Sequence, residues 1–290
     1  MKYLILALTV FFSFTSNLFS QDEEKSSLLW EISGKKVKSP SYLFGTMHLI
    51  PKDDFYFPEE LKEKVTSTDL LLMEVAGLQA QSQGTQLIML EEGNLFDFFT
   101  EEQSDSIFVA LNDLFGYTEE QVKMMFGSFK PFFLTQLFSS KQFGEAPESY
   151  EITLENLAKS NNMSVAGLET VEEQMGFIND LSQDMQVEMV MAAVRSAGDE
   201  MDEDTKKLIA AYTSRDLDQI HQYFIESSAT SSEIESKLLN NRNKKWIDPI
   251  KKTIRKNKTF IAVGAAHLPG ENGVINLLRK EGYTVTPIQY

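Results

Sequence analysis

The chain has 290 residues, of which 43 are acidic and 27 are basic, so its formal net charge at pH 7 is −16. A surface of this sign repels nucleic acid and anionic membranes, so we expect neither as a partner. The chain has no cysteine, which excludes disulfide bonds, thiolate catalysis and cysteine-ligated zinc.

The first twenty residues have the three parts of a secretory signal. Lys2 is a lone basic residue, the run 3–14 carries no charge, and Ser20 is a small residue before a polar, acidic segment. Polar side chains interrupt the apolar run before it reaches the ~20 residues that span a bilayer. We therefore expect residues 1–20 to be a signal peptide cleaved near Ser20. The mature protein would be exported, periplasmic or secreted, with no stable membrane span.

Short apolar runs alternate with helical patterns along the rest of the chain. The first two runs are separated by a turn and predict an opening hairpin. The third, at 69–75, is apolar throughout between acidic residues, as in a buried parallel strand. The predicted strands cover residues 28–32, 41–44, 69–75, 163–169, 258–263 and 283–288.

Two long helical regions separate these strands. Residues 95–145 form a helical insertion that is dense in Phe and Met, and residues 170–255 are again mainly helical. The apolar stripe of the insertion favours ordinary helical core over a substrate-binding lid. We predict one α/β domain over residues 21–290, with a central mixed, largely parallel sheet flanked by helices.

Two of the three histidines follow a glycine by three residues at the end of a predicted strand. They are His48, after Gly45, and His267, after Gly264. In open α/β sheets, sites form beyond the carboxyl ends of the strands, where glycine permits sharp turns and close approach to a ligand. The third histidine, His221, lies in a polar helical stretch and is predicted to be solvated.

Two glutamates end two further predicted strands. Glu74 and Glu169 would lie at the same sheet edge as the two histidines. Two imidazoles and two carboxylates could hold a divalent metal and leave room for water. They could also act without metal, one pair serving as general acid and base. The sequence has no Gly-x-Ser-x-Gly elbow, no His-Glu-x-x-His helix and no phosphate-binding glycine loop.

Five segments, in order along the chain, resemble the TraB/GumN family. That family includes the Tiki proteases that clip Wnt amino termini, and it is related to the erythromycin esterases. The similarity runs from about Leu28 to the C-terminus. The matching segments are Phe44-Gly45-Thr46-Met47-His48, Leu72-Met73-Glu74, Gly167–Gln174, Arg242-Asn243-x-x-Trp246 and Phe260–Leu268.

This resemblance implies an erythromycin-esterase-like α/β fold and a hydrolase, which in the Tiki proteins is a metal-dependent peptidase. Arg242 matches the family's Arg-Asn motif, which implies a partner for a site carboxylate or an oxyanion-stabilising group. Glu151 and Glu173 are weaker candidates. The catalytic candidates are His48, Glu74, Glu169, Arg242 and His267, and all of these except Arg242 are candidate metal ligands.

The leading hypothesis is an exported, metal-dependent hydrolase of peptides that uses a divalent ion of unspecified identity. One alternative is a metal-independent, esterase-like hydrolase with His48 or His267 as general base. The other is a protein that binds a metal or a peptide at the same site without turnover. A peptide or a small molecule is the expected partner in each case.

Overall fold

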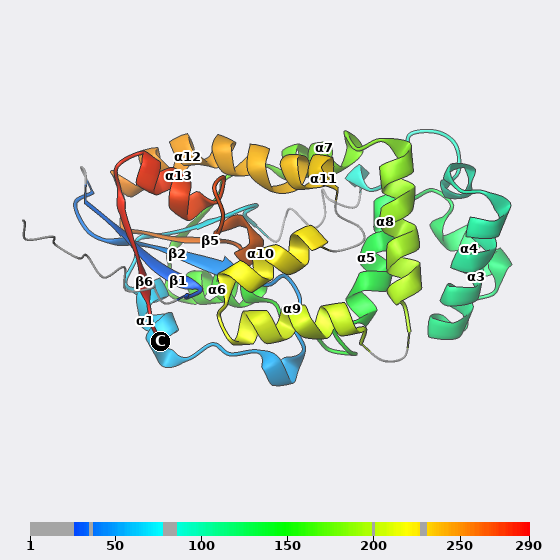
Figure 1. Cartoon of the computed structure of the whole chain (residues 1–290), viewed down its shortest axis with the longest axis horizontal. Helices are drawn as coiled ribbons and strands as arrows, with labels where there is room; N and C mark the ends of the chain where they lie inside the picture. The colour runs from blue at the N-terminus through cyan, green and yellow to red at the C-terminus, as the bar shows by residue number, and fades with distance from the viewer. Residues whose placement is uncertain (1–25, 35–36, 78–85, 199–200, 227–230) are drawn as a thin grey trace, which may run out of the picture.

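A six-stranded mixed sheet organises the part of the chain that the computed structural model describes (Figure 1). The described residues are 26–34, 37–77, 86–198, 201–226 and 231–290. The predicted signal peptide, residues 1–20, lies outside these ranges. Within them, no helix is both long and apolar enough to cross a membrane.

The strand order in the sheet is β4-β3-β5-β2-β1-β6. The four strands β4, β3, β5 and β2 are parallel, whereas β1 pairs antiparallel with both β2 and β6. The predicted mixed, largely parallel sheet and its opening hairpin are therefore confirmed. The strands are Leu29–Ser33 (β1), Ser41–Thr46 (β2), Leu70–Met73 (β3), Ser164–Gly167 (β4), Thr259–Gly264 (β5) and Thr284–Ile288 (β6).

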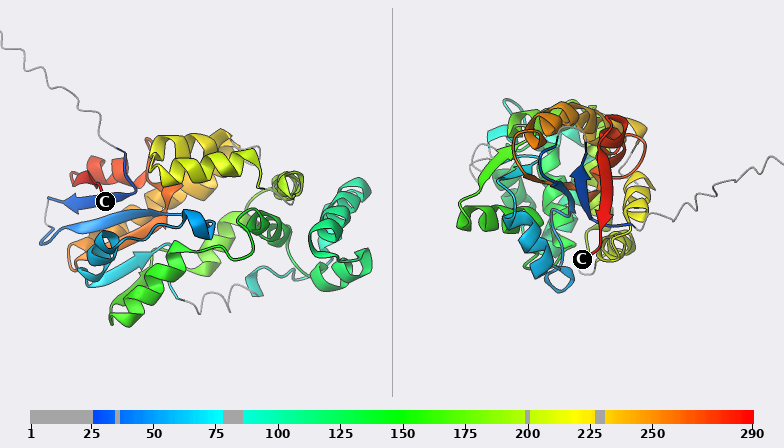
Figure 2. Two further views of the ribbon diagram at one scale, coloured as in Figure 1. Left: turned by 90° about the horizontal axis from the view of Figure 1, so that it is seen from below. Right: turned by 90° about the vertical axis from the view of Figure 1, so that its left-hand side faces the viewer.

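Helices cover both faces of the sheet. Helices α12 (Asn241–Ile254) and α13 (Val274–Lys280) lie on one face, and α1 (Glu59–Thr66) and α6 (Tyr150–Ser160) lie on the other (Figures 1 and 2). Every residue of β2 is buried, as are the first five residues of β5. Such double coverage explains why these strands are continuous apolar runs rather than alternating ones.

The predicted helical insertion is also confirmed, and its aromatic stripe forms a core of its own. Buried residues there include Leu111, Phe126, Leu134 and Phe138, and they pack with Val190 of a later helix. Met124, in contrast, is 79% exposed. The helices of this second core extend away from the sheet (Figure 1). They are α3 (Glu101–Phe115), α4 (Glu119–Phe126), α5 (Pro131–Lys141) and α8 (Gln183–Ser196), preceded by a 3-10 turn at Leu95–Phe98.

The later helical region returns the chain to the sheet. Between α9 and α10 the chain makes a tight reversal in which Arg215 adopts a left-handed backbone conformation. The segment Ser236–Asn240 is a π-helical turn that runs directly into α12. The remaining helices of this region are α7 (Val171–Asn179), α9 (Glu203–Thr213), α10 (Leu217–Glu226) and α11 (Ser232–Glu235).

One edge of the sheet gathers the carboxyl ends of the four parallel strands. In the strand register, Thr46 of β2 pairs with Gly264 of β5, and Met73 of β3 pairs with both Ala262 of β5 and Gly167 of β4. Because these strands are neighbours, the residues that follow them emerge side by side. This edge is where sites form in open α/β sheets.

Candidate active site

Arg242 occupies the centre of the sheet edge. Its Nη2 donates to Glu74 Oε2 at 2.5 Å and to Glu169 Oε1 at 2.5 Å, and its Nε donates to Glu169 as well, at 3.1 Å. The side chains of Arg242, Glu74 and Glu169 are 8%, 9% and 4% exposed. The three groups therefore form a buried ion-pair network, in which one guanidinium bridges two strand-end carboxylates.

The start of α12 fixes the position of Arg242. The π-helical turn that precedes it places the Leu238 carbonyl where Arg242 Nη1 donates to it at 3.0 Å. Such wider turns are rare in proteins as a whole, and where they occur they are often at functional sites. With Nε, Nη1 and Nη2 all donating to protein acceptors, Arg242 acts as the partner of site carboxylates. This is the first of the two roles that the resemblance implies.

Glu74 follows β3 directly, and its carboxylate accepts hydrogen bonds from three residues. Besides Arg242, Gly264 N–H donates to its Oε1 at 2.7 Å and Gln174 Nε2 donates to its Oε2 at 3.3 Å. Burial alone would raise its pKa, but the interactions with His267, Arg242 and the Gly264 N–H outweigh burial and lower the pKa to about 2. Glu74 is therefore a carboxylate at neutral pH.

Glu169, like Glu74, accepts hydrogen bonds at both of its oxygens. Arg242 Nε approaches both oxygens, and Trp246 Nε1 donates to Oε2 at 3.2 Å. Burial raises its pKa even though Arg242 opposes the shift. Its role in this geometry is to hold Arg242 and Trp246 in place.

His267 is buried and its tautomer is set by Asn243. The Asn243 amide nitrogen donates to the carbonyls of His267 and Asn272, at 3.3 and 2.9 Å, which turns its oxygen toward His267 Nδ1 at 2.6 Å. Nδ1 therefore carries the proton, and Nε2 presents a lone pair that lies 3.3 Å from the donor Arg242 Nη1 and 3.6 Å from Glu74 Oε1. Burial lowers the pKa of His267 to about 3, so the ring is neutral.

His48 is the exposed imidazole of the edge, with 68% of its side chain accessible. Its Nδ1 lies 2.8 Å from Glu151 Oε1, and Thr46 Oγ1 donates to the same oxygen at 2.5 Å. Ser149 caps α6 and so places Glu151 in its first turn, facing β2. The Glu151 carboxylate raises the pKa of His48, and the charge of His48 acts in turn on the pKa values of Glu74 and His267.

The glycines of the two Gly-x-x-His segments provide space rather than a sharp turn. A Cβ atom on Gly45 would lie 3.0 Å from Ala265 Cα, and one on Gly264 would lie 3.3 Å from Glu74 Oε1. Neither glycine has a positive φ. Both glycines are therefore closely packed, at a backbone conformation that other residues can also adopt.

The donor set fits a divalent metal ion in part. Among the described residues, no group of three or more His, Asp or Glu side chains is already arranged to hold one. His267 Nε2 and Glu74 Oε1 are nevertheless two acceptors 3.6 Å apart, close to the spacing of two ligands bound at ~2.0–2.2 Å to one ion. His48 Nε2 has no hydrogen bond to another described residue and is a third donor. Both oxygens of Glu169 face Arg242 or Trp246, whereas Glu74 Oε1 accepts from the Gly264 N–H and faces His267, so Glu74 is the better-placed carboxylate.

Several residues that sequence analysis did not place in the site have clear roles in it. Asn243 and Trp246 belong to the Arg-Asn-x-x-Trp segment, but helical spacing alone gives no sign of their contacts with His267 and Glu169. Glu173, a weaker candidate, instead forms a capping box with Thr170 at the start of α7. His221 is half-buried rather than solvated, and its ring lies 3.2 Å from where a Cβ on Gly270 would be.

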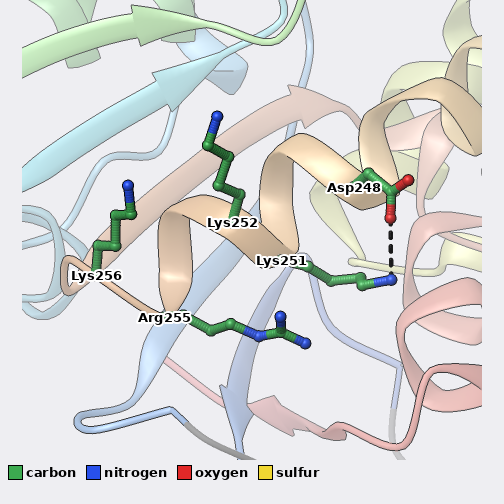
Figure 3. A pocket seen from close by; sticks show the side chains of 5 residues that line it. All are labelled: Asp248, Lys251, Lys252, Arg255 and Lys256. Carbon is green, nitrogen blue, oxygen red and sulfur yellow. Dashed lines mark hydrogen bonds and ion pairs between the residues drawn. The ribbon is translucent and has the colours of Figure 1, made fainter.

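A basic hollow of about 480 Å³ lies elsewhere, at the C-terminal end of α12 (Figure 3). It contains none of the candidate residues. Arg255 donates to Tyr283, which precedes β6, so the hollow adjoins the amino ends of the parallel strands. The candidate site residues lie at the carboxyl ends of these strands, at the opposite edge of the sheet. The hollow is lined by Asp248, Lys251, Lys252, Arg255 and Lys256.

A model of the TraB/PrgY/gumN family matches residues 28–287, which is nearly the whole chain. No curated protein and no solved structure matches the chain. The match includes the four strand ends and α12, and therefore every residue of the buried network.

The ion-pair network predicts a large loss of stability when its cation is removed. Arg242→Met leaves Glu74 and Glu169 buried without a counter-charge, which should lower the free energy of unfolding by about 3–5 kcal/mol. Arg195→Gln breaks an exposed pair with Glu188 and should change it by less than ~1 kcal/mol. Urea unfolding of both variants measures this, and equal small effects would contradict a buried network.

The protonation states predict how acid affects metal-free protein. The pKa of His267 is lowered from 6.5 to about 3, so below pH 6.5 the unfolded chain binds a proton that the folded chain excludes. Stability should fall with pH across this window, by up to about 1.4 kcal/mol per pH unit. Glu74, lowered from 4.5 to about 2, adds an effect of the same sign below pH 4.5.

His48 provides the control because its folded pKa is raised. The stability that the His48 pair contributes to the folded state is fully present below pH 6.5 and is lost only as the pH rises above that value. Between pH 5 and 6.5, His267→Gln should therefore flatten the pH dependence of urea unfolding, and His48→Ala should leave it unchanged. The same slope in wild type and His267→Gln would mean that His267 is not buried in its neutral form.

Proposed function

The chain belongs to the TraB/PrgY/gumN family, and we propose that it is a hydrolase that cleaves peptides at the strand-end site. The observation that carries this proposal is the anchoring of both motif imidazoles. Each Nδ1 is bonded to a side-chain oxygen, from Glu151 or from Asn243, and each Nε2 lies at the same sheet edge, that of His267 3.3 Å from Arg242 Nη1. This arrangement is typical of metal-ligating and of catalytic histidines.

Charge and donor chemistry support a metal-dependent version of this function. Glu74 and Glu169 carry two negative charges against the one of Arg242, so the buried network is net negative. His267 Nε2, Glu74 Oε1 and His48 Nε2 would hold the ion. A bound divalent ion polarises the scissile carbonyl and lowers the pKa of water. Arg242 keeps Glu74 ionised, and Asn243 keeps the His267 lone pair turned toward Glu74.

The His48–Glu151 pair supports a second candidate, metal-independent hydrolysis. His48 is exposed and its Nδ1 is bonded to Glu151, which raises the pKa of His48 to about 9, so the neutral imidazole that can accept a proton is populated mainly at alkaline pH. His267, with its lowered pKa, is a poor base in the same setting. Among the two histidines considered as general base, the geometry thus favours His48. It would take a proton from water as the water attacks and return it to the leaving group.

A metal and turnover analysis of matched variants tests the proposal. Metal content and hydrolysis of a peptide library would be measured for wild type, His48→Ala, His267→Ala and Glu74→Gln, with His221→Ala as the matched control. Each of the first three should lose at least about 100-fold in kcat/KM, whereas His221→Ala should behave as wild type. If a metal is used, the same three variants lose bound ion, and chelation removes wild-type activity.

Two outcomes separate the candidates. Full turnover of chelated protein, together with loss of activity in His48→Ala, would replace the metal-dependent version by the His48–Glu151 version. Wild-type turnover in both His48→Ala and His267→Ala would contradict a hydrolytic site at this edge.

Export is a separate proposal that rests on the N-terminal pattern of Lys2, the uncharged run and Ser20. The mature chain should begin near Gln21. Intact-mass measurement of protein recovered from outside the cytoplasm tests this, and a retained Met1 would contradict it.

A further inference from the structure

A cavity of about 340 Å³ lies on the same sheet edge as the candidate active site. Leu28, which precedes β1, and Tyr290, which follows β6, both line it. Gly45 N–H donates to the Leu28 carbonyl at 2.9 Å, and Leu29 pairs with Ile288 of β6. The cavity therefore continues the row of strand ends, one strand beyond β2 and His48.

The cavity adjoins the candidate active site through residues that contact or neighbour it. Tyr212 donates its hydroxyl to the Gly45 carbonyl at 3.0 Å, at the start of the first Gly-x-x-His segment. Tyr150 lines the cavity too, and the next residue, Glu151, is the partner of His48. A ligand in this cavity would lie beside His48.

Arg215 is the cation of the cavity, and its guanidinium is not neutralised. It forms no hydrogen bond or ion pair to another described residue through its side chain, although it is half-buried. Its Cζ lies 4.1 Å from the ring centroid of Tyr290 and 5.7 Å from that of Tyr56. The contrast is Arg242, whose donors all have protein acceptors. Aromatic contacts hold Arg215 while leaving its N–H groups available.

The backbone conformation at Arg215 is unfavourable for an arginine. Its φ is +63°, in the left-handed region just after α9, where glycine or asparagine is favoured. The other described non-glycine residue with positive φ is Asn162, after α6, which obeys this preference. An arginine in such a position indicates that its side chain is needed.

The other polar groups of the cavity define what Arg215 would bind. Tyr150 donates its hydroxyl to the Tyr56 carbonyl, and burial raises the pKa of Tyr150, Tyr212 and Tyr290 above the usual range. The tyrosines are therefore neutral and form flat apolar walls. Asp53 and Asp54 also line the cavity and are exposed, so they oppose the binding of any anion, and most strongly that of anions of higher charge such as phosphates.

We propose that this cavity is a carboxylate-binding subsite in which Arg215 forms a paired hydrogen bond with one carboxylate and the tyrosine rings contact the apolar group beside it. The ligand class is a monocarboxylate with an apolar or aromatic body, of the size of one or two amino-acid residues. As a substrate subsite it rests on the proposed function, because it would place the carboxylate end of a peptide next to His48. The binding of a monocarboxylate in this cavity does not depend on the proposed function.

Equilibrium binding of N-acetylphenylalanine to the mature chain, measured by titration calorimetry, tests the proposal. N-acetylphenylalaninamide has nearly the same shape without the charge. Arg215→Asn removes the cation and suits the left-handed backbone, so circular dichroism should show that it folds as wild type. Arg195→Gln removes an equal charge from the exposed surface. Loss of the carboxylate or of Arg215 should each weaken binding by roughly tenfold or more, and Arg195→Gln should have no effect.

A third probe, N-acetyl-Asp-Phe-amide, identifies the source of the carboxylate. Binding as tight as that of N-acetylphenylalanine would point to acidic side chains, and weak binding would point to peptide C-termini. Equal binding by wild type and Arg215→Asn, or no saturable binding to folded wild type, would overturn the subsite. His48→Ala separates the two proposals, because it should bind N-acetylphenylalanine as wild type does even if it has lost turnover.

Discussion

The account depends on one buried interaction, the pairing of a single guanidinium with two carboxylates at the ends of neighbouring parallel strands. Removing three charges from water is expensive, and the cost is offset only if each charge finds good partners. Glu74 meets Arg242, Gly264 N–H and Gln174, and Glu169 meets Arg242 and Trp246. The network ties β3 and β4 to α12 and fixes where a reacting group could lie.

The neighbouring chemistry follows from this placement. Because Arg242 Nη2 takes Glu74 Oε2, the other oxygen of Glu74 faces Gly264 and His267. Burial keeps His267 neutral, and Asn243 fixes which nitrogen carries the proton. His48, on the next strand, remains exposed. The edge thus combines a buried network of charged side chains with one solvent-accessible imidazole. Such an arrangement is suited to acyl-transfer chemistry on a bound carbonyl.

The sequence predicts the fold and the gathering of Glu74, Glu169 and His267 at one sheet edge, because both depend on the period and position of apolar residues. Apolar runs that end in Glu74 or His267 identify parallel strands, and parallel strands share one edge. What cannot be read in this way is which side chains meet. Arg242 lies on a helix far along the chain, and its central position depends on a π-helical turn that has no simple sequence signature. Glu151 reaches His48 from the first turn of α6, which Ser149 caps, and the strand-end pattern gives no sign of that contact.

The central claim is that His48 and His267, 219 positions apart in the sequence, act on the same reaction. The most direct measurement is a double-mutant cycle on kcat/KM for peptide hydrolysis with His48→Ala, His267→Ala and the double variant. If the two residues act as a unit, the double variant should be about as slow as the slower single variant, since either loss alone disables the site. If each histidine contributes independently, the two losses would multiply, and the shared site would be contradicted.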